Sequence, residues 1–179
     1  MNYSQIEEFI KPIADGIRLL VLDVDGILTD NRLYFSASGE ELKAFNTQDG
    51  LGIKLLQQAG VKVALITGRQ STIVAERARS LGIEHVIQGR DDKLNVLDDL
   101  LAKLGMHYDE VAYAGDDLPD LACISRVKLG ITVPNGHFLV REAASVMTSK
   151  YGGEGAVREI CDWLIIAQGK LEQIIAPYH

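Results

Sequence analysis

Asp23-Val24-Asp25-Gly26-Ile27-Leu28-Thr29, preceded by the apolar run from Ile17 to Leu22, is the most informative stretch of this chain. The run is interrupted only by Arg18 and is typical of a buried strand in a parallel sheet, which we place at residues 18–24. The acids Asp23 and Asp25 stand two residues apart, and extended geometry would point both side chains the same way. Buried acids are costly unless a cation compensates them. Because Mg²⁺ prefers oxygen ligands, the stretch predicts a magnesium site.

The composition describes an ordinary globular chain. It has 179 residues, 47% of them hydrophobic, which is enough for one domain with a sizeable core. The net charge of -7 argues against a nucleic-acid partner. Cys123 and Cys161 lack metal-ligand spacing and fit a reducing compartment. Without a signal-like start or a membrane-spanning apolar run, we expect a cytoplasmic protein with no membrane partner.

Strand-like and helical patterns alternate along the chain, which predicts an α/β fold with a doubly wound, mostly parallel sheet of the Rossmann-like kind. Further parallel strands are expected at residues 61–66 and 110–114. A β-hairpin insertion is expected at about residues 31–46, and a tail from residue 171 to the end. We find no linker, so the whole of residues 1–179 is expected to form a single domain.

Polar residues follow three of the predicted strands. The first strand leads into the acidic pair, the second into Thr67-Gly68-Arg69, and a later one into Gly115-Asp116-Asp117, with Asp120 shortly after. Parallel strands bring their carboxyl ends to one edge of the sheet, where ligands bind in open α/β folds. Each motif alone is an ordinary turn or helix cap, but together they predict one site.

This ordered set, completed by Lys93, resembles the haloacid dehalogenase-like phosphatase family. The resemblance implies that Asp23 is the nucleophile that takes up a phosphoryl group and that Asp25 is the general acid, then the base. It implies that Thr67 and Lys93 bind the phosphate. Mg²⁺ would be held by Asp23, the backbone carbonyl of Asp25 and Asp116. The remaining acids, Asp117 and Asp120, would lie behind these ligands.

Other motifs resemble a capless branch of that family, because neither usual cap position leaves room for a cap domain. They are residues 39–46 (Gly-Glu-Glu-Leu-Lys-Ala-Phe-Asn), 49–54 (Asp-Gly-Leu-Gly-Ile-Lys), 152–159 (Gly-Gly-Glu-Gly-Ala-Val-Arg-Glu) and 167–170 (Ala-Gln-Gly-Lys). The resemblance implies a homotetramer that hydrolyses a sugar acid phosphate, 3-deoxy-D-manno-octulosonate 8-phosphate, in lipopolysaccharide precursor biosynthesis. The implied substrate-binding residues are Asp25, Asn46, Thr47, Gln48, Asp49, Gly50, Lys54, Gly68, Arg69, Arg77 and Lys93.

Some positions depart from the pattern of this branch and leave alternatives open. Gln48 and Glu154 stand where basic residues are common, and residues 133–137 differ from the usual turn. Another substrate, such as a nonulosonate 9-phosphate, therefore stays possible, as do phosphoryl transfer to another acceptor and a non-catalytic scaffold. A hairpin that exposes Leu33, Phe35, Leu42 and Phe45 would mediate the oligomer, and by resemblance the tail could reach a neighbouring subunit.

Overall fold

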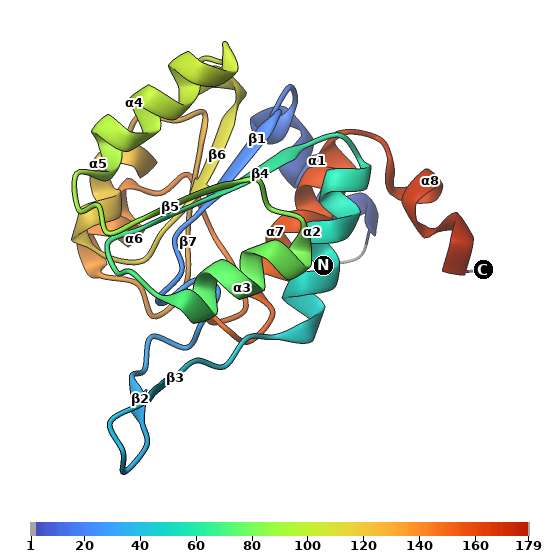
Figure 1. Ribbon diagram of the computed structural model, residues 1–179. Coiled ribbons are helices and arrows are strands. Elements are labelled where there is room, and N and C mark those ends of the chain that lie inside the picture. Colours follow the sequence, from blue (N-terminus) through green and yellow to red (C-terminus); the bar gives the residue numbers. More distant parts are fainter. Residues whose placement is uncertain (1–2, 179) are drawn as a thin grey trace.

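The computed structural model describes residues 3–178. A six-stranded sheet of order β5-β4-β1-β6-β7-β8 forms its centre, and a two-stranded sheet, β2-β3, lies apart from it (Figure 1). The strands are β1 (Leu19–Leu22), β2 (Tyr34–Phe35), β3 (Glu41–Leu42), β4 (Lys62–Thr67), β5 (His85–Gln88), β6 (Val111–Ala114), β7 (Leu129–Thr132) and β8 (Val146–Met147). All neighbours in the large sheet pair in parallel, which confirms the predicted fold class.

Helices cover both faces of this sheet (Figure 1). One face carries α1 (Tyr3–Ala14), α2 (Thr47–Gln58), α3 (Thr72–Leu81) and α7 (Ala156–Ala167), and the other carries α4 (Lys93–Leu104), α5 (Leu121–Ile124) and α6 (Phe138–Ala143). The strands divide their side chains between the two layers, because successive residues of a strand point to opposite faces. In β1, Leu20 and Leu22 join the first core, whereas Leu19 and Val21 join the second.

Sequence signals mark several helix ends. The side chain of Asn46 accepts a hydrogen bond from the backbone N–H of Gln48 at 2.7 Å and begins α2. Gly82 ends α3 and Gly105 ends α4, both in the left-handed conformation that glycine adopts at low cost. Three short 3-10 segments complete the described chain: η1 (Tyr108–Glu110), η2 (Leu118–Asp120) and η3 (Ala176–Tyr178).

The strand register brings the predicted motifs to one edge. Leu22 lies opposite both Leu65 and Ala114, so Asp23 after β1 comes level with Ile66 near the end of β4 and with Gly115 just after β6. The N–H of Asp23 donates to the carbonyl of Ala114 at 2.9 Å, which extends the ladder by one residue beyond the strand. The chain runs from β1 to one side of the sheet and returns to β6 on the other, which creates a switch point at this edge.

Two local predictions were wrong. The first strand ends at Leu22 and not at residue 24, since residues 25–28 form a turn. The predicted tail contains a short helix, α8 (Leu171–Ile175), whose Ile174 is buried. Residues 1, 2 and 179 of the predicted domain lie outside the described residues.

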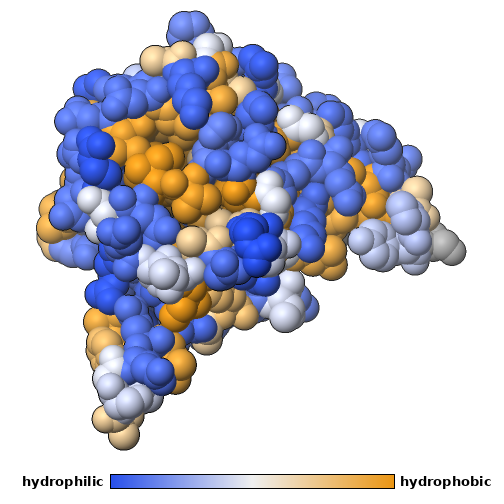
Figure 2. Space-filling view, viewed as in Figure 1, coloured by the Kyte–Doolittle hydropathy of each residue, from blue (hydrophilic) through white to orange (hydrophobic). Residues whose placement is uncertain are grey.

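The hairpin β2-β3 projects from the body of the molecule (Figure 1). Its strands are only two residues long, and the space-filling view shows the projecting segment carrying both polar and apolar surface (Figure 2). Leu33, Phe35 and Leu42 are exposed as expected, but Phe45 packs partly buried against the core below the hairpin. Among residues 3–178, no helix has the length and apolar character needed to cross a membrane.

Candidate active site

A cavity of about 430 Å³ opens at the carboxyl edge of β1, β4 and β6. It is lined by Asp23, Asp25, Asn31, Thr67, Gly68, Arg69, Asp91, Lys93, Asp116, Asp117, Pro119 and Asp120. All three predicted strand-end motifs and the predicted lysine therefore meet in one place. The structure also adds residues that the sequence did not single out, notably Asn31 and Asp91.

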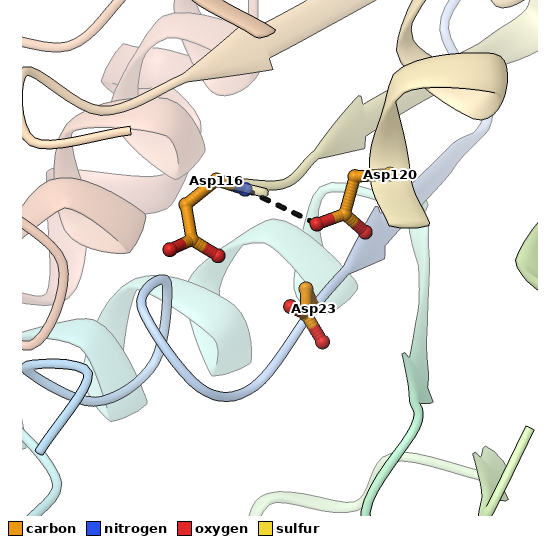
Figure 3. Close-up of side chains that lie close together, drawn as sticks. All are labelled: Asp23, Asp116 and Asp120. Carbon is orange, nitrogen blue, oxygen red and sulfur yellow. Dashed lines mark hydrogen bonds between the residues drawn. The ribbon is translucent and has the colours of Figure 1, made fainter. Parts of the chain in front are cut away.

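Three of these acids form a compact buried group. Asp23, Asp116 and Asp120 each offer an oxygen within 4.8 Å of the others (Figure 3). Lys93, at the first position of α4, lies 3.0 Å from Asp23 Oδ1 and 2.7 Å from Asp120 Oδ1. Burial tends to lower the pKa of Lys93, but the two carboxylates outweigh it and raise that pKa. Lys93 is therefore a permanent cation that holds Asp23 in place.

Asp120 is saturated by hydrogen bonds from the protein itself. Its Oδ1 accepts from Lys93 and, at 2.8 Å, from the hydroxyl of Tyr113. Its Oδ2 accepts from the backbone N–H groups of Asp116 and Asp117, at 3.2 and 3.3 Å, and Figure 3 shows the first of these bonds. With both oxygens occupied, Asp120 organises the loop after β6 instead of offering a free ligand atom. Its place behind the metal ligands stays a prediction.

Asp116 has one oxygen whose hydrogen bonding is incomplete. Its Oδ2 accepts from the side-chain amide of Asn31 at 2.9 Å, but its buried Oδ1 has no hydrogen-bond partner. Burial, followed by repulsion from Asp120, raises the pKa of Asp116 to about 7. Burial and Asp120 likewise raise the pKa of Asp23, although Lys93 opposes them. Three buried carboxylates that share a single buried lysine, with one unpartnered oxygen on Asp116, are a donor set that fits a hard divalent cation.

The loop after β1 brings Asp25 to the cavity by a route that the sequence did not predict. The carbonyl of Val24 accepts hydrogen bonds from the N–H groups of Ile27, Leu28 and Thr29, so the chain turns sharply here. Asp25 therefore lies at the start of a turn and not on the strand, and both Asp23 and Asp25 line the cavity. Asp25 contacts Lys43 and Arg69, a set of partners separate from that of Asp23.

Gly26 is required by the close approach of two loops. It has a φ of +93°, and a Cβ built on it would lie 2.2 Å from Asp116 Oδ2. Any side chain here would displace the carboxylate that fits a metal. The sequence placed Gly26 in a turn, but only the tertiary structure shows that Asp116 occupies the space beside it.

The second motif supplies a hydroxyl and a cation. Thr67 ends β4 and is 2% exposed, with its Oγ1 accepting from the N–H of Arg69 at 3.4 Å. Gly68 has no side chain between the backbone and the cavity, and Arg69 is 45% exposed. These groups line the cavity from the end of β4, and Asp116 lines it from the end of β6, with β1 between the two strands.

Asp117 has a local structural role as well. Its side chain accepts from the N–H of Leu118 at 2.8 Å and caps η2, while the residue remains exposed at the rim of the cavity. The sequence allowed such a cap for this acidic pair. The structure assigns the cap to Asp117 alone, because Asp116 turns inward.

A further group of predicted substrate contacts lies outside this cavity. None of Asn46, Thr47, Gln48, Asp49, Gly50, Lys54 and Arg77 lines it. Asp49 is fully buried, and its Oδ1 accepts from the N–H of Arg158 at 2.7 Å, at the start of α7. Arg77 donates to the carbonyl of Asn46 at 3.2 Å, and its guanidinium lies 5.7 Å from the centre of the Phe45 ring. Within one chain, Asp49 links α2 to α7 and Arg77 braces the base of the hairpin, and neither side chain lines the cavity.

Sequence reasoning missed Asn31, Asp91 and Lys43. Asn31 has a positive φ of 65°, which asparagine tolerates better than most residues, and its position after Asp30 signals only a turn. Asp91 is exposed at the rim, with Oδ1 2.3 Å from where a Cβ on Gly68 would lie. Lys43 belongs to a hairpin that appeared unrelated to the strand-end motifs. Nothing local distinguishes these three residues from surface residues.

Comparisons with known proteins agree with this geometry. A family model described as haloacid dehalogenase-like hydrolase matches residues 83–160. The 3-deoxy-D-manno-octulosonate 8-phosphate phosphatase of Escherichia coli (strain K12) is 45% identical over 96% of this chain and 91% of its own length. The corresponding enzyme of Moraxella catarrhalis, solved with magnesium, phosphate and KDO, is 44% identical with a TM-score of 0.92. It covers 99% of this chain and 100% of that one.

The enzyme of the same name from Yersinia pestis is a third relative, 45% identical with a TM-score of 0.88 and coverage of 91% of this chain and 88% of that one. The similarity thus extends through the strand-end motifs, the hairpin and the glycine-rich residues near the C-terminus. A similarity of this extent, joined to a cavity in which the predicted motifs meet, shows that the chain belongs to the haloacid dehalogenase-like family of hydrolases.

Proposed function

We propose that this protein is a magnesium-dependent phosphatase that hydrolyses 3-deoxy-D-manno-octulosonate 8-phosphate to the free sugar acid and phosphate, in lipopolysaccharide precursor biosynthesis. The observation that carries this proposal is that the buried Asp23 lies 3.0 Å from Lys93 and groups with Asp116, which keeps an unpartnered carboxylate oxygen. The relatives named for this activity support the choice of substrate. We further propose that residues 1–179 act as a single phosphatase domain in the cytoplasm.

In the first half of the reaction, Asp23 acts as the nucleophile. One of its carboxylate oxygens attacks phosphorus and forms an aspartyl-phosphate, while the bond from phosphorus to the sugar oxygen breaks. The proton held by Asp25 passes to that leaving oxygen. In the second half, Asp25 takes a proton from water, whose oxygen attacks phosphorus and releases Asp23 and phosphate. A covalent intermediate divides one difficult transfer into two easier ones.

The other residues of the cavity supply position and charge. Asp23, the backbone carbonyl of Asp25 and Asp116 would hold Mg²⁺, which supplies positive charge that screens the repulsion between the nucleophile and an anionic phosphate. Lys93 keeps Asp23 in place through the contact at 3.0 Å. Thr67 and the N–H of Gly68 would donate to phosphate oxygens. Phosphoryl transfer depends mainly on such positioning and charge stabilisation.

Among six acids, the cavity offers two cations, Arg69 and Lys93, to a substrate with two anionic groups. Arg69 is exposed at the rim, and a guanidinium binds a carboxylate with two parallel hydrogen bonds. We propose that Arg69 faces the sugar acid while Thr67 and Lys93 face the phosphate. The acids Asp91 and Asp117 at the same rim can accept hydrogen bonds from sugar hydroxyls.

We also propose that the protein is a homo-oligomer, the homotetramer that its family resemblance implies. The support is the projecting hairpin, which is too short to be stable alone and exposes Leu33, Phe35 and Leu42. A neighbouring subunit would cover these side chains and help to exclude water from a site that has no cap.

Phosphate release tests the proposed activity directly. The purified protein with Mg²⁺ is expected to release phosphate from 3-deoxy-D-manno-octulosonate 8-phosphate faster than from a nonulosonate 9-phosphate or simple sugar phosphates. Asp23→Asn is expected to abolish release while the protein stays folded, and the exposed Asp109→Asn serves as the matched control. Activity retained by Asp23→Asn would refute the nucleophile. Preference for another sugar acid phosphate would change the substrate assignment but not the proposed phosphatase mechanism.

A further inference from the structure

The side chain of Lys43 is buried at the exit of the hairpin. It is only 2% exposed, although it follows an exposed strand of two residues. Its ammonium contacts Asp25 Oδ1 and lies 3.3 Å from Glu41 Oε1. A lysine is rarely buried unless it is paired, because removing its charge from water is expensive. The two carboxylates compensate that cost, so the amine is held in one place.

Arg69 closes this arrangement into a ring of four charges. Its Nη2 lies 3.0 Å from the same oxygen of Glu41, and its Nε lies 3.8 Å from Asp25 Oδ2. Cations and carboxyl groups thus alternate around the ring. Their formal charges cancel in the half of the cycle in which Asp25 has given up its proton. The two oxygens of Asp25 face different cations, Lys43 on one side and Arg69 on the other.

The two cations differ in their freedom to move. Arg69 is 45% exposed and lines the cavity, so an entering anion can recruit it away from the ring. Lys43 does not line the cavity, and its buried amine has no comparable access to an entering substrate. After Arg69 turns to the substrate, Lys43 is the contact that continues to orient the carboxyl group of Asp25.

We propose that Lys43 is a positioning residue for proton transfer by Asp25, held in turn by Glu41, so that the base of the hairpin is part of the catalytic apparatus of its own chain. This inference rests on the proposed function, because it requires Asp25 to give its proton to the leaving oxygen as the phosphorus–oxygen bond breaks. Lys43 keeps its own protons throughout. Misplacing a proton donor by about 1 Å costs as much as a hundredfold in rate.

The leaving group of the substrate provides the test. An alkoxide, such as the sugar oxygen, needs the proton of Asp25, whereas p-nitrophenolate is a stable anion and leaves without it. We expect Lys43→Met to lower kcat/KM for the sugar acid phosphate by at least about tenfold. We expect the same variant to lower kcat/KM for p-nitrophenyl phosphate by less than about threefold, since attack by Asp23 does not involve Lys43.

Two further variants complete the design. Lys43→Arg keeps the charge and should recover most of the lost activity. Lys103 is exposed on α4, and Lys103→Met should leave kcat/KM unchanged for both substrates. If Lys43→Met does not fold by circular dichroism, Glu41→Gln removes the support of Lys43 and should show the same selective loss. Equal losses on both substrates, or no loss, in a folded variant would overturn the inference.

The wild-type protein separates this inference from the proposed function. If it releases phosphate from neither substrate, the proposed function fails and takes the inference with it. If it hydrolyses p-nitrophenyl phosphate and prefers a different alkyl phosphate, only the substrate assignment fails. The comparison of variants is then made with that alkyl phosphate, and the selective loss remains the expected result.

Discussion

Gly152 packs against the carbonyl group of Gly26 so closely that a Cβ built on Gly152 would lie 1.8 Å from that oxygen. The same glycine-rich segment donates a hydrogen bond from the N–H of Gly153 to the carbonyl of Ile27 at 3.0 Å. The turn that carries Asp25 is therefore supported from behind by residues more than a hundred positions later in the chain. This contact links the glycine-rich motif to the site without placing any of its side chains in the cavity.

Gly152→Ala is expected to reduce kcat strongly, because the added methyl group must push the turn at Gly26 away from Asp116. The matched control is Gly82→Ala, where a Cβ meets nothing within 4 Å but the positive φ of 70° is strained. That control should cost about 1 kcal/mol of stability and leave kcat unchanged. Phosphate release and thermal unfolding of both variants check this, and equal kcat values would contradict it.

Addition of Mg²⁺ is expected to raise the unfolding temperature, because the ion binds the folded acids and not the unfolded chain. At a concentration of 100 times Kd the gain is about 2.7 kcal/mol. Asp116→Asn removes the carboxylate with the unpartnered oxygen and should abolish the shift. Differential scanning fluorimetry measures it without any substrate. The exposed Asp109→Asn is the control and should keep the shift. If the shift also persists in Asp116→Asn, Mg²⁺ binds at another site.

Asp49 predicts a pH dependence of stability. Burial raises its pKa from 3.8 to about 6, while hydrogen bonds from the backbone at the start of α7 oppose the shift. The folded protein thus holds this proton more tightly than the unfolded chain. Between these two values stability falls as the pH rises, and above about pH 6 the loss is complete and constant.

Asp49→Asn does not titrate, so its stability relative to wild type should increase from about pH 4 to pH 6, by up to about 3 kcal/mol, and then stay level. Asp49→Ala should show the same dependence on pH at lower stability, because it also loses the acceptor for the N–H of Arg158. Urea unfolding across this range measures both. If the Asp49 variants instead show a large rise in KM and a stability difference from wild type that does not change with pH, Asp49 binds substrate.

The hairpin should control the oligomeric state. Leu42 is 56% exposed, and Leu42→Glu would place a charge where a neighbouring subunit is proposed to pack. We expect the wild-type protein to sediment as an oligomer at micromolar concentration and this variant to sediment as a smaller species. Ser38→Glu, at the turn, is the control of equal charge. A monomeric wild-type protein would end the proposal.

Much of the site followed from residues that are close together in sequence. The apolar run before Asp23, the Thr67-Gly68-Arg69 motif and the Gly115-Asp116-Asp117 block each sit at the end of a buried strand. Parallel pairing brings such ends to one edge, whatever the details of the loops. The convergence of Asp23, Thr67 and Asp116 could thus be predicted, together with Lys93, which entered through a family resemblance.

The direction of each side chain could not be predicted in this way. The strand was expected to continue to residue 24, but it ends at Leu22 and Asp25 begins a turn, because the carbonyl of Val24 accepts hydrogen bonds from three N–H groups. Asp49 and Arg77 are predicted at the substrate, and only the structure shows that Asp49 contacts α7 and Arg77 the hairpin base. These outcomes depend on which distant segment fills the space beside a residue.

By itself, the sequence determined the parallel α/β architecture, the edge of the sheet at which the chemistry lies and the acids that meet there. Those features arise from local periodicity and from motifs of a few residues. Only the tertiary structure decided that Asp120 is saturated while Asp116 keeps a free oxygen, and that Lys43 contacts Asp25. The physical reason is that hydrogen-bond saturation and charge pairing are properties of packed segments far apart in the chain, and no local pattern records them.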